Sequence, residues 1–373
     1  MGRYMIDIFK YISRDKIEKL CDEAKVPREA AERALRHIDE DDFAPFAPHI
    51  NGLFSGETGE AAAKEIERMC REPDGGEVAS VDDGGTVDDS ETPGDGGVGA
   101  QADGGDDAAR DGGDDAARDG GVGAQADGGD DAARDGGESH KPGRQQDDGF
   151  KEMAIFLIAA LRTREAYEEM GIDDGIFIHT MSLFRRIIAE YVVHYGKIGF
   201  NRGHWFYRQI ANVITRLGVL EFETLLLDEG AEVGLPGETN VPVLSVHIPS
   251  DAVMTREALD ESYQTALQFF PKYYPDFKFK RFHCSTWLLA PALRELLQAG
   301  SRILNFQDDY CLTDIDEDDK GHMFWIFNIR GAAPDYAALP EDTALRRAAK
   351  RHLMAGGRIG AASGYVSGRN AVK

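Results

Sequence analysis

The sequence predicts a mixed α/β (α+β) protein with a helical N-terminal part, a disordered acidic repeat linker and a mixed sheet flanked by helices. Apolar residues recur at helical spacing before residue 72, residues 73–149 are rich in Gly and Asp, and the apolar pattern changes to alternation after Val219. With 373 residues, 42% of them hydrophobic, the chain is long enough for two domains and apolar enough to bury a core. These numbers exclude a wholly disordered protein.

The segment 1–72 predicts a small helical domain. Its apolar side chains form short stretches at helical spacing, and Val26-Pro27 interrupts them because proline disfavours a continuing helix. The stretches contain Ile17, Leu20, Cys21 and Ala24, then Ala31, Leu35 and Ile38, then Ala63, Ile66, Met69 and Cys70.

The segment 73–149 predicts a disordered linker. It holds 21 of the 42 glycines and 22 Asp and Glu against 5 Lys and Arg, and residues 98–113 return unchanged at 122–137. A repeat of Gly, Asp, Ala and Arg has no large apolar side chain to bury, so the segment repels itself and stays extended. It contributes −17 of the net charge of −25, which leaves −4 on each flank.

Charge and cysteine content narrow the class of protein. A net charge of −25 argues against nucleic-acid binding, which needs a positive surface. The N-terminus has no signal-peptide core, and the longest apolar run, 153–161, is too short to span a membrane. Four dispersed cysteines indicate free thiols in a reducing compartment. We therefore expect a cytoplasmic protein that binds neither nucleic acid nor a membrane.

Residues 150–217 predict a helical segment that packs on the C-terminal domain. One apolar stripe predicts a single long helix, and residues 204–217 continue the helical pattern up to Gly218. The stripe consists of Phe177, Met181, Phe184, Ile188, Tyr191 and Tyr195.

Residues 218–373 predict the α/β domain. Strands are expected at 219–227, 241–248, 279–288, 302–312 and 322–328, with the last two paired as a hairpin. Helices are expected after Thr255, after Pro291 and, with a basic surface, at 343–354.

Three blocks of this domain, residues 217–227, 243–270 and 282–307, resemble a bacterial family of acyltransferase-domain proteins with a helical N-terminal domain and a GNAT-like C-terminal domain. GNAT denotes the superfamily of CoA-dependent N-acetyltransferases. The resemblance covers residues 150–365 and, more loosely, 1–72. It implies an N-acyltransferase that uses acetyl-CoA or another acyl-CoA as co-substrate, acts on an amine and needs no metal.

The resemblance also implies where the acyl donor lies. In a GNAT sheet the fourth and fifth strands, here 241–248 and 279–288, splay apart and hold the pantetheine arm, with the pyrophosphate near the next helix start. The implied cofactor-binding residues are Ser250, Thr255, Arg256 and Arg281. The usual (Gln or Arg)xxGx(Gly or Ala) loop is replaced by residues 249–255, whose Asp251 would repel a phosphate.

Strand alternation selects the candidate catalytic residues His247 and Ser285. His247 shares a face with Val243 and Ser245, and Ser285 shares a face with Arg281 and His283. Histidine titrates near neutrality, so His247 is the candidate general base, with Ser285 as a hydrogen-bonding group. The alternative is a histidine hydrogen-bonded within the sheet.

Other residues favour structural roles. Cys284 is expected to be a buried structural cysteine, Tyr310 is expected in the core, and no residue is assigned as general acid. The basic segment 343–358 either cradles a phosphate or forms a solvated helix with a glycine cap. For the whole protein, the alternative to an enzyme is a non-catalytic GNAT-like scaffold that binds a small ligand or a partner.

Overall fold

The computed structural model describes residues 8–54, 59–71, 148–329 and 335–372, which belong to one compact unit. The linker predicted at 73–149 lies outside these residues except for Asp148 and Gly149, so it stays a prediction. Gly149 is required where the described chain resumes, because it has φ +86° and an added Cβ would stand 1.9 Å from the Phe200 carbonyl oxygen.

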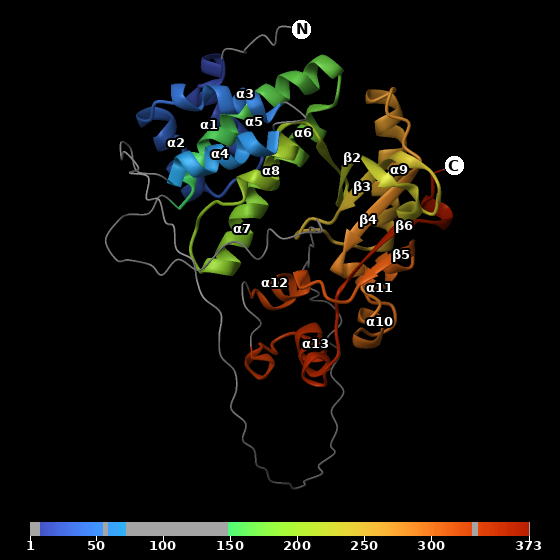
Figure 1. Cartoon of the computed structure of the whole chain (residues 1–373). Helices are drawn as coiled ribbons and strands as arrows, with labels where there is room; N and C mark the ends of the chain where they lie inside the picture. The colour runs from blue at the N-terminus through green and yellow to red at the C-terminus, as the bar shows by residue number, and fades with distance from the viewer. Residues whose placement is uncertain (1–7, 55–58, 72–147, 330–334, 373) are drawn as a thin grey trace, which may run out of the picture. The chain divides into compact units, whose positions relative to one another are not determined.

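The N-terminal part is helical, as predicted. It contains α1 (Arg14–Glu23), α2 (Arg28–Glu40), α3 (Ala47–Leu53) and α4 (Gly59–Arg71), together with the short 3-10 turns Ile8–Tyr11 and Ala44–Phe46. Helix α2 packs on α5 (Phe150–Met170), and α4 packs on α8 (Gly203–Ile210). Every side chain of α5 from Met153 to Leu161 is buried, so this apolar run is the centre of the helical layer (Figure 1).

Two predicted helices differ in the structure. The single helix through Phe177 and Tyr195 is wrong, because Ser182 separates α6 (Asp174–Met181) from α7 (Leu183–Tyr195) and its hydroxyl donates to the His179 carbonyl at 2.6 Å. The helix predicted at 204–217 is also wrong, because it ends at Ile210 and Asn212 has φ +60°. Residues Ile214–Leu217 instead form strand β1.

The C-terminal part contains a six-stranded mixed sheet, which confirms the predicted fold class (Figure 1). Its strands are β1, β2 (Leu220–Glu229), β3 (Thr239–His247), β4 (Arg281–Thr286), β5 (Tyr310–Asp316) and β6 (Ala361–Val366), in the order β1-β2-β3-β4-β6-β5. Only the β3–β4 pair is parallel. Its ladder ends at Ser245↔His283, although β3 continues to His247 and β4 to Thr286. The two strands stop pairing before they end, as the GNAT resemblance implies.

One face of the sheet is an aromatic core beneath α9 (Arg256–Tyr273). Tyr263 and Phe270 of α9 contact Phe222 of β2, with ring centroids 6.2 and 6.4 Å away, and Tyr263 lies 5.1 Å from Phe282 of β4. The residues that alternate with His247 on β3 and with Ser285 on β4, namely Leu244, Val246, Ile248, Phe282 and Cys284, are all buried in this core.

The region after β4 differs from the predicted strands. Residues Arg302–Gln307 form α11, which Ser301 caps, and only Tyr310–Asp316 are extended. The strand predicted at 322–328 is helix α12 (Gly321–Phe327), whose buried residues His322, Met323, Ile326 and Phe327 follow helical spacing. The partner of β5 is β6, where an added Cβ at Gly364 would stand 2.5 Å from the Cys311 carbonyl oxygen. The predicted hairpin is therefore wrong.

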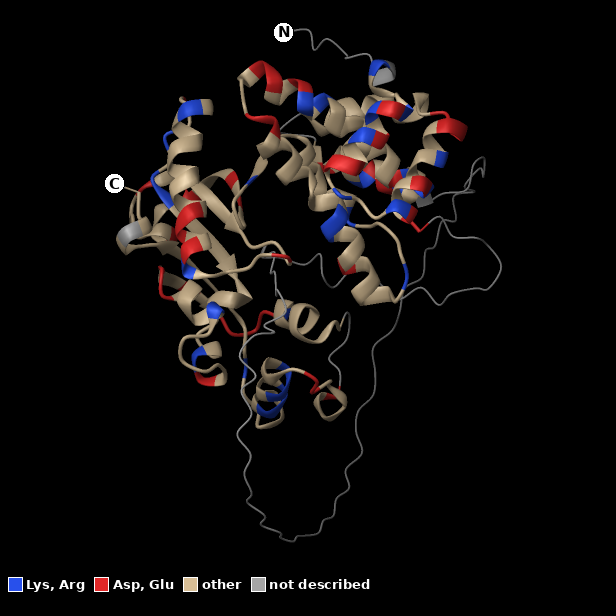
Figure 2. Ribbon diagram, turned by 180° about the vertical axis from the view of Figure 1, so that it is seen from behind, with Lys and Arg blue, Asp and Glu red and all other residues tan. Residues whose placement is uncertain are grey.

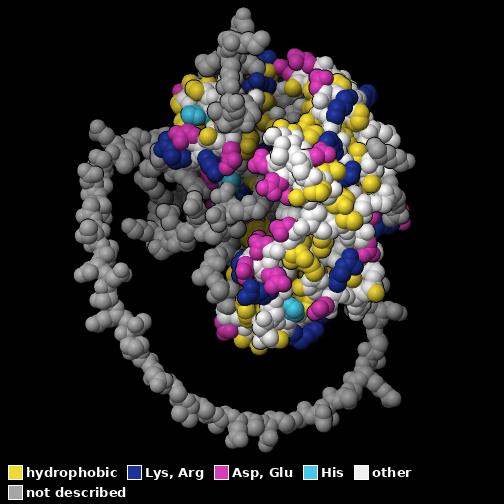
Figure 3. Space-filling model, turned by 45° about the vertical axis from the view of Figure 1, so that its right-hand side comes forward, with side chains coloured by type: hydrophobic (Ala, Val, Ile, Leu, Met, Phe, Trp, Pro, Cys, Tyr) yellow, Lys and Arg dark blue, Asp and Glu magenta, His cyan; other side chains and the backbone are white. Residues whose placement is uncertain are grey.

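The remaining helices are α10 (Leu293–Leu296) and α13 (Ala344–Met354), close to their predicted positions. None of the helices in the described ranges combines the length and apolar character that crossing a membrane requires. On the face shown in Figure 3, Lys and Arg side chains lie among Asp and Glu and do not form one positive field. None of the four cysteines forms a disulfide within the described residues.

Candidate active site

His247 ends β3 on the sheet face opposite α9, and it is 2% exposed. Its Nε2 lies 2.8 Å from Oε2 of Glu223 on β2, whereas its Nδ1 is buried and has no hydrogen-bond partner among the described residues. Beside a carboxylate, Nε2 carries the proton, which leaves a lone pair on Nδ1. The ring can therefore accept a proton at Nδ1 while Glu223 fixes its orientation.

Glu223 is held in its ionised form. Burial raises the pKa of this carboxyl, but the hydrogen bond from His247 and the charge of Arg208 outweigh it, so the pKa lies below its ordinary value. Arg208 of α8 reaches Oε2 at 3.0 Å and lies 3.6 Å above the ring of Trp205, which meets His247 edge-on with centroids 5.9 Å apart. Helix α8 and strand β2 together hold His247.

Sequence reasoning missed Glu223, although the pattern contains a signal for it. Glu221 and Glu223 alternate with Leu220 and Phe222 on β2, so both carboxylates share the face of their ladder partners His247 and Ser245. Two buried glutamates in an apolar strand need cationic or hydrogen-bonding partners. Glu221 finds them in Arg186 at 2.9 Å and Gln209 at 3.0 Å.

His283 of β4 lies next to this pair. It faces Ser245 in the parallel ladder, is 5% exposed, and neither of its ring nitrogens has a hydrogen-bond partner among the described residues. Burial, with a smaller contribution from His247, lowers the pKa of His283 to about 4. His283 is therefore a neutral imidazole at pH 7, whose Nε2 lies 4.0 Å from Oε2 of Glu232 and whose ring makes no hydrogen bond with the described residues.

Ser285 and Arg281 occupy opposite ends of β4. Ser285 is half-buried two residues beyond His283, where continued pairing would bring it opposite His247. Arg281 begins the strand, donates to the Lys280 carbonyl at 3.0 Å and lies 5.8 Å from the ring of Tyr365. Of the predicted set, His247 and Ser285 share the end where the ladder opens, and Arg281 does not.

Residues of the loop from β3 to α9 form hydrogen bonds and an ion pair with side chains and backbone groups of the same chain. Ser250 donates to Glu190 of α7 at 2.5 Å. Thr255 caps α9 by accepting from the Ala258 N–H at 3.3 Å. Arg256 pairs with Asp309 and donates to the Asn305 carbonyl. The Arg256 guanidinium therefore already has two partners. Ser250 and Thr255 lie in the loop between β3 and α9, and each also has one hydrogen-bond partner.

The charge of Asp251 is compensated. Its carboxylate lies 2.9 Å from Arg216 of β1 and 3.1 Å from Arg185 of α7. Burial raises the pKa of Asp251, but Arg216, Arg186 and Arg185 outweigh it and lower the pKa. The predicted repulsion between Asp251 and a phosphate is therefore reduced by arginines that are distant in the sequence.

Two alternative reactive groups belong to the core. Cys284 is fully buried, its Sγ donates to the Val246 carbonyl at 3.2 Å, and burial raises the pKa of its thiol far above the ordinary value. Tyr310 shares a 2.9 Å hydrogen bond with the Tyr263 hydroxyl, and burial raises its pKa well above the ordinary value. The interpretation of both as core residues is confirmed.

Comparison with known protein families gives two matches. Residues 113–212 match the N-acyltransferase N-terminal domain and residues 214–366 match the GNAT-like C-terminal domain. The chain is thus similar to an N-acyltransferase N-terminal domain followed by a GNAT-like C-terminal domain. The resemblance seen in the sequence is thus confirmed, and the boundary between the two domains coincides with the change from α8 to β1. None of the curated proteins compared with the chain matches it.

Solved structures of acyltransferases share the fold. The crystal structure of an acyltransferase in complex with decanoyl-CoA and teicoplanin is 26% identical, with a TM-score of 0.51 over 58% of this chain and 65% of that chain. An acyltransferase in complex with CoA and 10C-teicoplanin is 25% identical, with the same TM-score and coverage. The chain therefore spans slightly less than two thirds of the length of these structures.

Proposed function

We propose that this protein is an acyl-CoA-dependent N-acyltransferase in which His247 is the general base. The observation that carries the proposal is the buried His247 ring, oriented by Glu223 at 2.8 Å and left with a free acceptor at Nδ1 where the β3–β4 ladder has ended. A buried acceptor without a partner costs stability, so its retention supports a group that meets a substrate proton.

The reaction follows from this geometry. The amine nitrogen of the acceptor attacks the thioester carbonyl carbon, the C–N bond forms, and the C–S bond breaks with its electron pair leaving on the CoA sulfur. Nδ1 of His247 takes the proton that the amine loses, and the ionised Glu223 stabilises the resulting imidazolium. The imidazolium can later return this proton to the thiolate or to solvent.

The acyl donor would lie in the opening between β3 and β4. Beyond Ser245↔His283 the strands no longer pair, so backbone N–H groups there are available to polarise the thioester carbonyl. Ser285 lies on the same face and is the proposed hydrogen-bonding group. The pyrophosphate would lie at the loop that contains Ser250 and Thr255, beside Arg185, whose side chain is 43% exposed.

Three of the expected donor contacts are not in place in this structure. Ser250 would have to release Glu190 and Arg256 would have to release Asp309 before either could donate to a phosphate. Arg281 lies at the other end of β4 from Ser285. The acceptor class is a small-molecule amine. The related structures hold decanoyl-CoA and teicoplanin, which supports testing medium-chain acyl donors as well as acetyl-CoA.

Calorimetric titration of acetyl-CoA, octanoyl-CoA and decanoyl-CoA into the full chain, followed by an assay of CoA release with a panel of amines, tests this proposal. At 100 times its Kd, a bound ligand should also raise the free energy of unfolding by about 2.7 kcal/mol. Saturable binding with amine-dependent CoA release is expected. Binding without release under any amine would favour the non-catalytic scaffold, and no binding at millimolar ligand would contradict both donor and reaction.

A further inference from the structure

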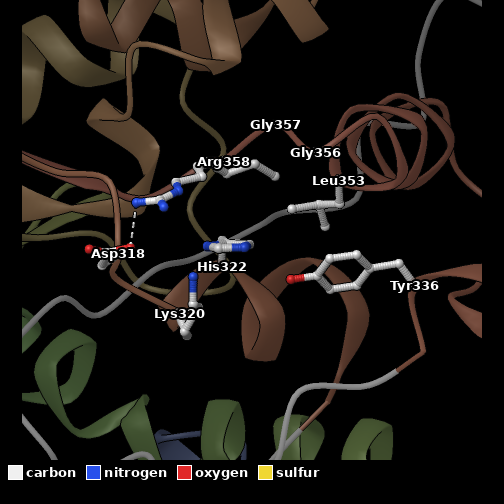
Figure 4. A pocket seen from close by; sticks show the side chains of 9 residues that line it. Asp318, Lys320, His322, Tyr336, Leu353, Gly356, Gly357 and Arg358 are labelled. Carbon is white, nitrogen blue, oxygen red and sulfur yellow. Dashed lines mark hydrogen bonds and ion pairs between the residues drawn. The ribbon is translucent and has the colours of Figure 1, made fainter. Parts of the chain in front are cut away.

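A cavity of about 240 Å³ lies in the C-terminal region, between α12 and the turn that connects α13 to β6 (Figure 4). Its wall consists of Asp318, Lys320 and His322 at the start of α12, Tyr336, Leu353 of α13 and residues 356–359 of the turn after α13. None of the residues assigned to acyl transfer lines it. The cavity is therefore a separate feature of the described chain.

His322 provides an unused polar group in this cavity. The residue is 2% exposed, its ring lies in the cavity (Figure 4), and its buried Nδ1 makes no hydrogen bond within the described chain. Burial and the nearby Lys320 ammonium outweigh the Asp319 carbonyl and lower the pKa of His322 to about 4, so the ring is neutral at pH 7. A buried imidazole without a partner is costly, and a ligand polar group would remove that cost.

The cavity wall carries two cationic side chains, Lys320 and Arg358, and one carboxylate, Asp318. Residues 343–358 contain five Lys and Arg and no Asp or Glu, but of these only Arg358 lines the cavity, and Arg346 and Lys350 pair with Asp342 and Glu341. Figure 2 shows Lys and Arg along α13. Lys320 forms no ion pair with any described residue, whereas Arg358 pairs with Asp318 at 2.7 Å at an exposed site. An anion would be attracted here and would compete with Asp318 for Arg358.

The glycines of this turn do not themselves bind a ligand. The Gly356 N–H donates to the Leu353 carbonyl at 3.0 Å and the Gly357 N–H to the His352 carbonyl at 2.9 Å, so both close the end of α13. The glycine cap predicted as one alternative is therefore present. Any recognition at the cavity depends on the side chains.

We propose that the cavity binds a phosphoryl group through Lys320, His322 and the Tyr336 hydroxyl. Two donors at the start of α12 and a third at Tyr336 suit the several terminal oxygens of a phosphoryl group, and lysine is a frequent phosphate ligand. Leu353 and Ile359 supply an apolar wall for the rest of the ligand. The phosphoryl group could belong to the 3′-phosphate of CoA or to a free phosphorylated small molecule, and the experiment separates these sources.

Calorimetric titration of the full chain at constant ionic strength with inorganic phosphate, CoA and 3′-dephospho-CoA tests the site. Lys320→Gln removes the exposed ammonium without disturbing the core, and Lys272→Gln is the matched control, because Lys272 is also exposed and contacts only Tyr273 by side chain. His322→Phe tests the imidazole. We expect Lys320→Gln to weaken binding about tenfold or more, which corresponds to about 1.4 kcal/mol, and Lys272→Gln to change nothing.

The outcomes separate cleanly. Loss of phosphate affinity in Lys320→Gln identifies a free phosphorylated ligand, whereas loss confined to CoA, with dephospho-CoA bound equally by both proteins, identifies the CoA 3′-phosphate. Equal affinities of Lys320→Gln and Lys272→Gln for all three ligands, or no binding of any, would overturn the proposal even if His322→Phe fails to fold. Phosphate binding must persist in His247→Ala, so failure of the acyl-transfer proposal would not imply failure of this site.

Discussion

The two faces of the sheet differ in whether their buried polar groups have hydrogen-bond partners. Beneath α9, Tyr263 and Tyr310 hydrogen-bond to each other and Cys284 donates to a backbone carbonyl, so the polar groups there are satisfied. On the other face, the Nδ1 of His247 and both ring nitrogens of His283 have no hydrogen-bond partner among the described residues, although Nε2 of His283 lies 4.0 Å from Glu232. The first arrangement stabilises the fold, whereas the second costs stability, and we propose that its unpaired groups meet a substrate.

Removal of the base should have the largest effect on turnover. His247→Ala should lower kcat about 100-fold or more, because a positioned general base contributes about 10²- to 10⁴-fold. The protein should stay folded, as measured by circular dichroism, and should still bind acyl-CoA.

Tyr310→Phe is the matched change on the opposite face. It removes one buried hydroxyl that bonds to Tyr263, so it should lower the free energy of unfolding by about 1 kcal/mol and leave kcat within about twofold. Equal losses of kcat in the two variants would break the distinction between the faces.

Glu223→Gln tests the positioning role of the carboxylate. The amide keeps the shape but cannot stabilise an imidazolium, so kcat should fall about 10- to 100-fold, as for other groups that orient a histidine. The KM for acyl-CoA should stay unchanged, and Glu223→Asp should recover part of the loss. A rise in KM with kcat preserved would assign Glu223 to donor binding instead.

The lowered pKa of His283 predicts a dependence of stability on pH. The unfolded histidine takes up a proton near pH 6.5, whereas the folded one does so only at about 4. Between these values the unfolded state binds more protons, so this contribution is complete above pH 6.5 and is lost as pH falls toward 4. The free energy of unfolding can be measured with urea at pH 7.5 and 4.5 for the wild type and for His283→Asn. Between these pH values the wild type should lose on the order of 1–2 kcal/mol more than the variant. Parallel pH dependences would contradict the neutral, buried state of His283.

The smallest expected effect concerns the loop after β3. Asp251→Asn removes a carboxylate held by Arg216 and Arg185 and leaves both guanidiniums available to an anion. Acyl-CoA binding should tighten by about 0.3–1 kcal/mol, the range for partly exposed charges. If Asp251 instead holds the loop in the conformation that binds the donor, calorimetry of the variant will show weaker acyl-CoA binding.

The alternation of side chains along the strands predicted which residues share a face. It could not predict contacts between residues that are distant in the sequence. Alternation placed His247 and Ser285 on one side and Cys284 on the other, because side-chain direction in a strand repeats every second residue. The segment 322–328 was misassigned because a short apolar run fits a strand and a buried helix equally well.

The partners of the site were harder to predict. Arg208 is 15 residues from Glu223 in the chain, and Arg185 is 66 residues from Asp251, so their contacts exist only after α7 and α8 pack on the sheet. The sequence therefore predicted that His247 lies on the face opposite Cys284, but not the carboxylate that contacts it or the arginines that neutralise the loop.

The central claim is that the His247 face of the sheet receives the acyl donor. NMR spectra of the ¹⁵N-labelled imidazole rings, assigned by the signals lost in His→Asn variants, report this directly during titration with decanoyl-CoA. Resonances of His247 and His283 should shift to saturation, whereas that of His37, whose ring bonds to Asp41 in the N-terminal helices, should not move. Saturated binding with the His247 and His283 resonances unchanged would contradict the account.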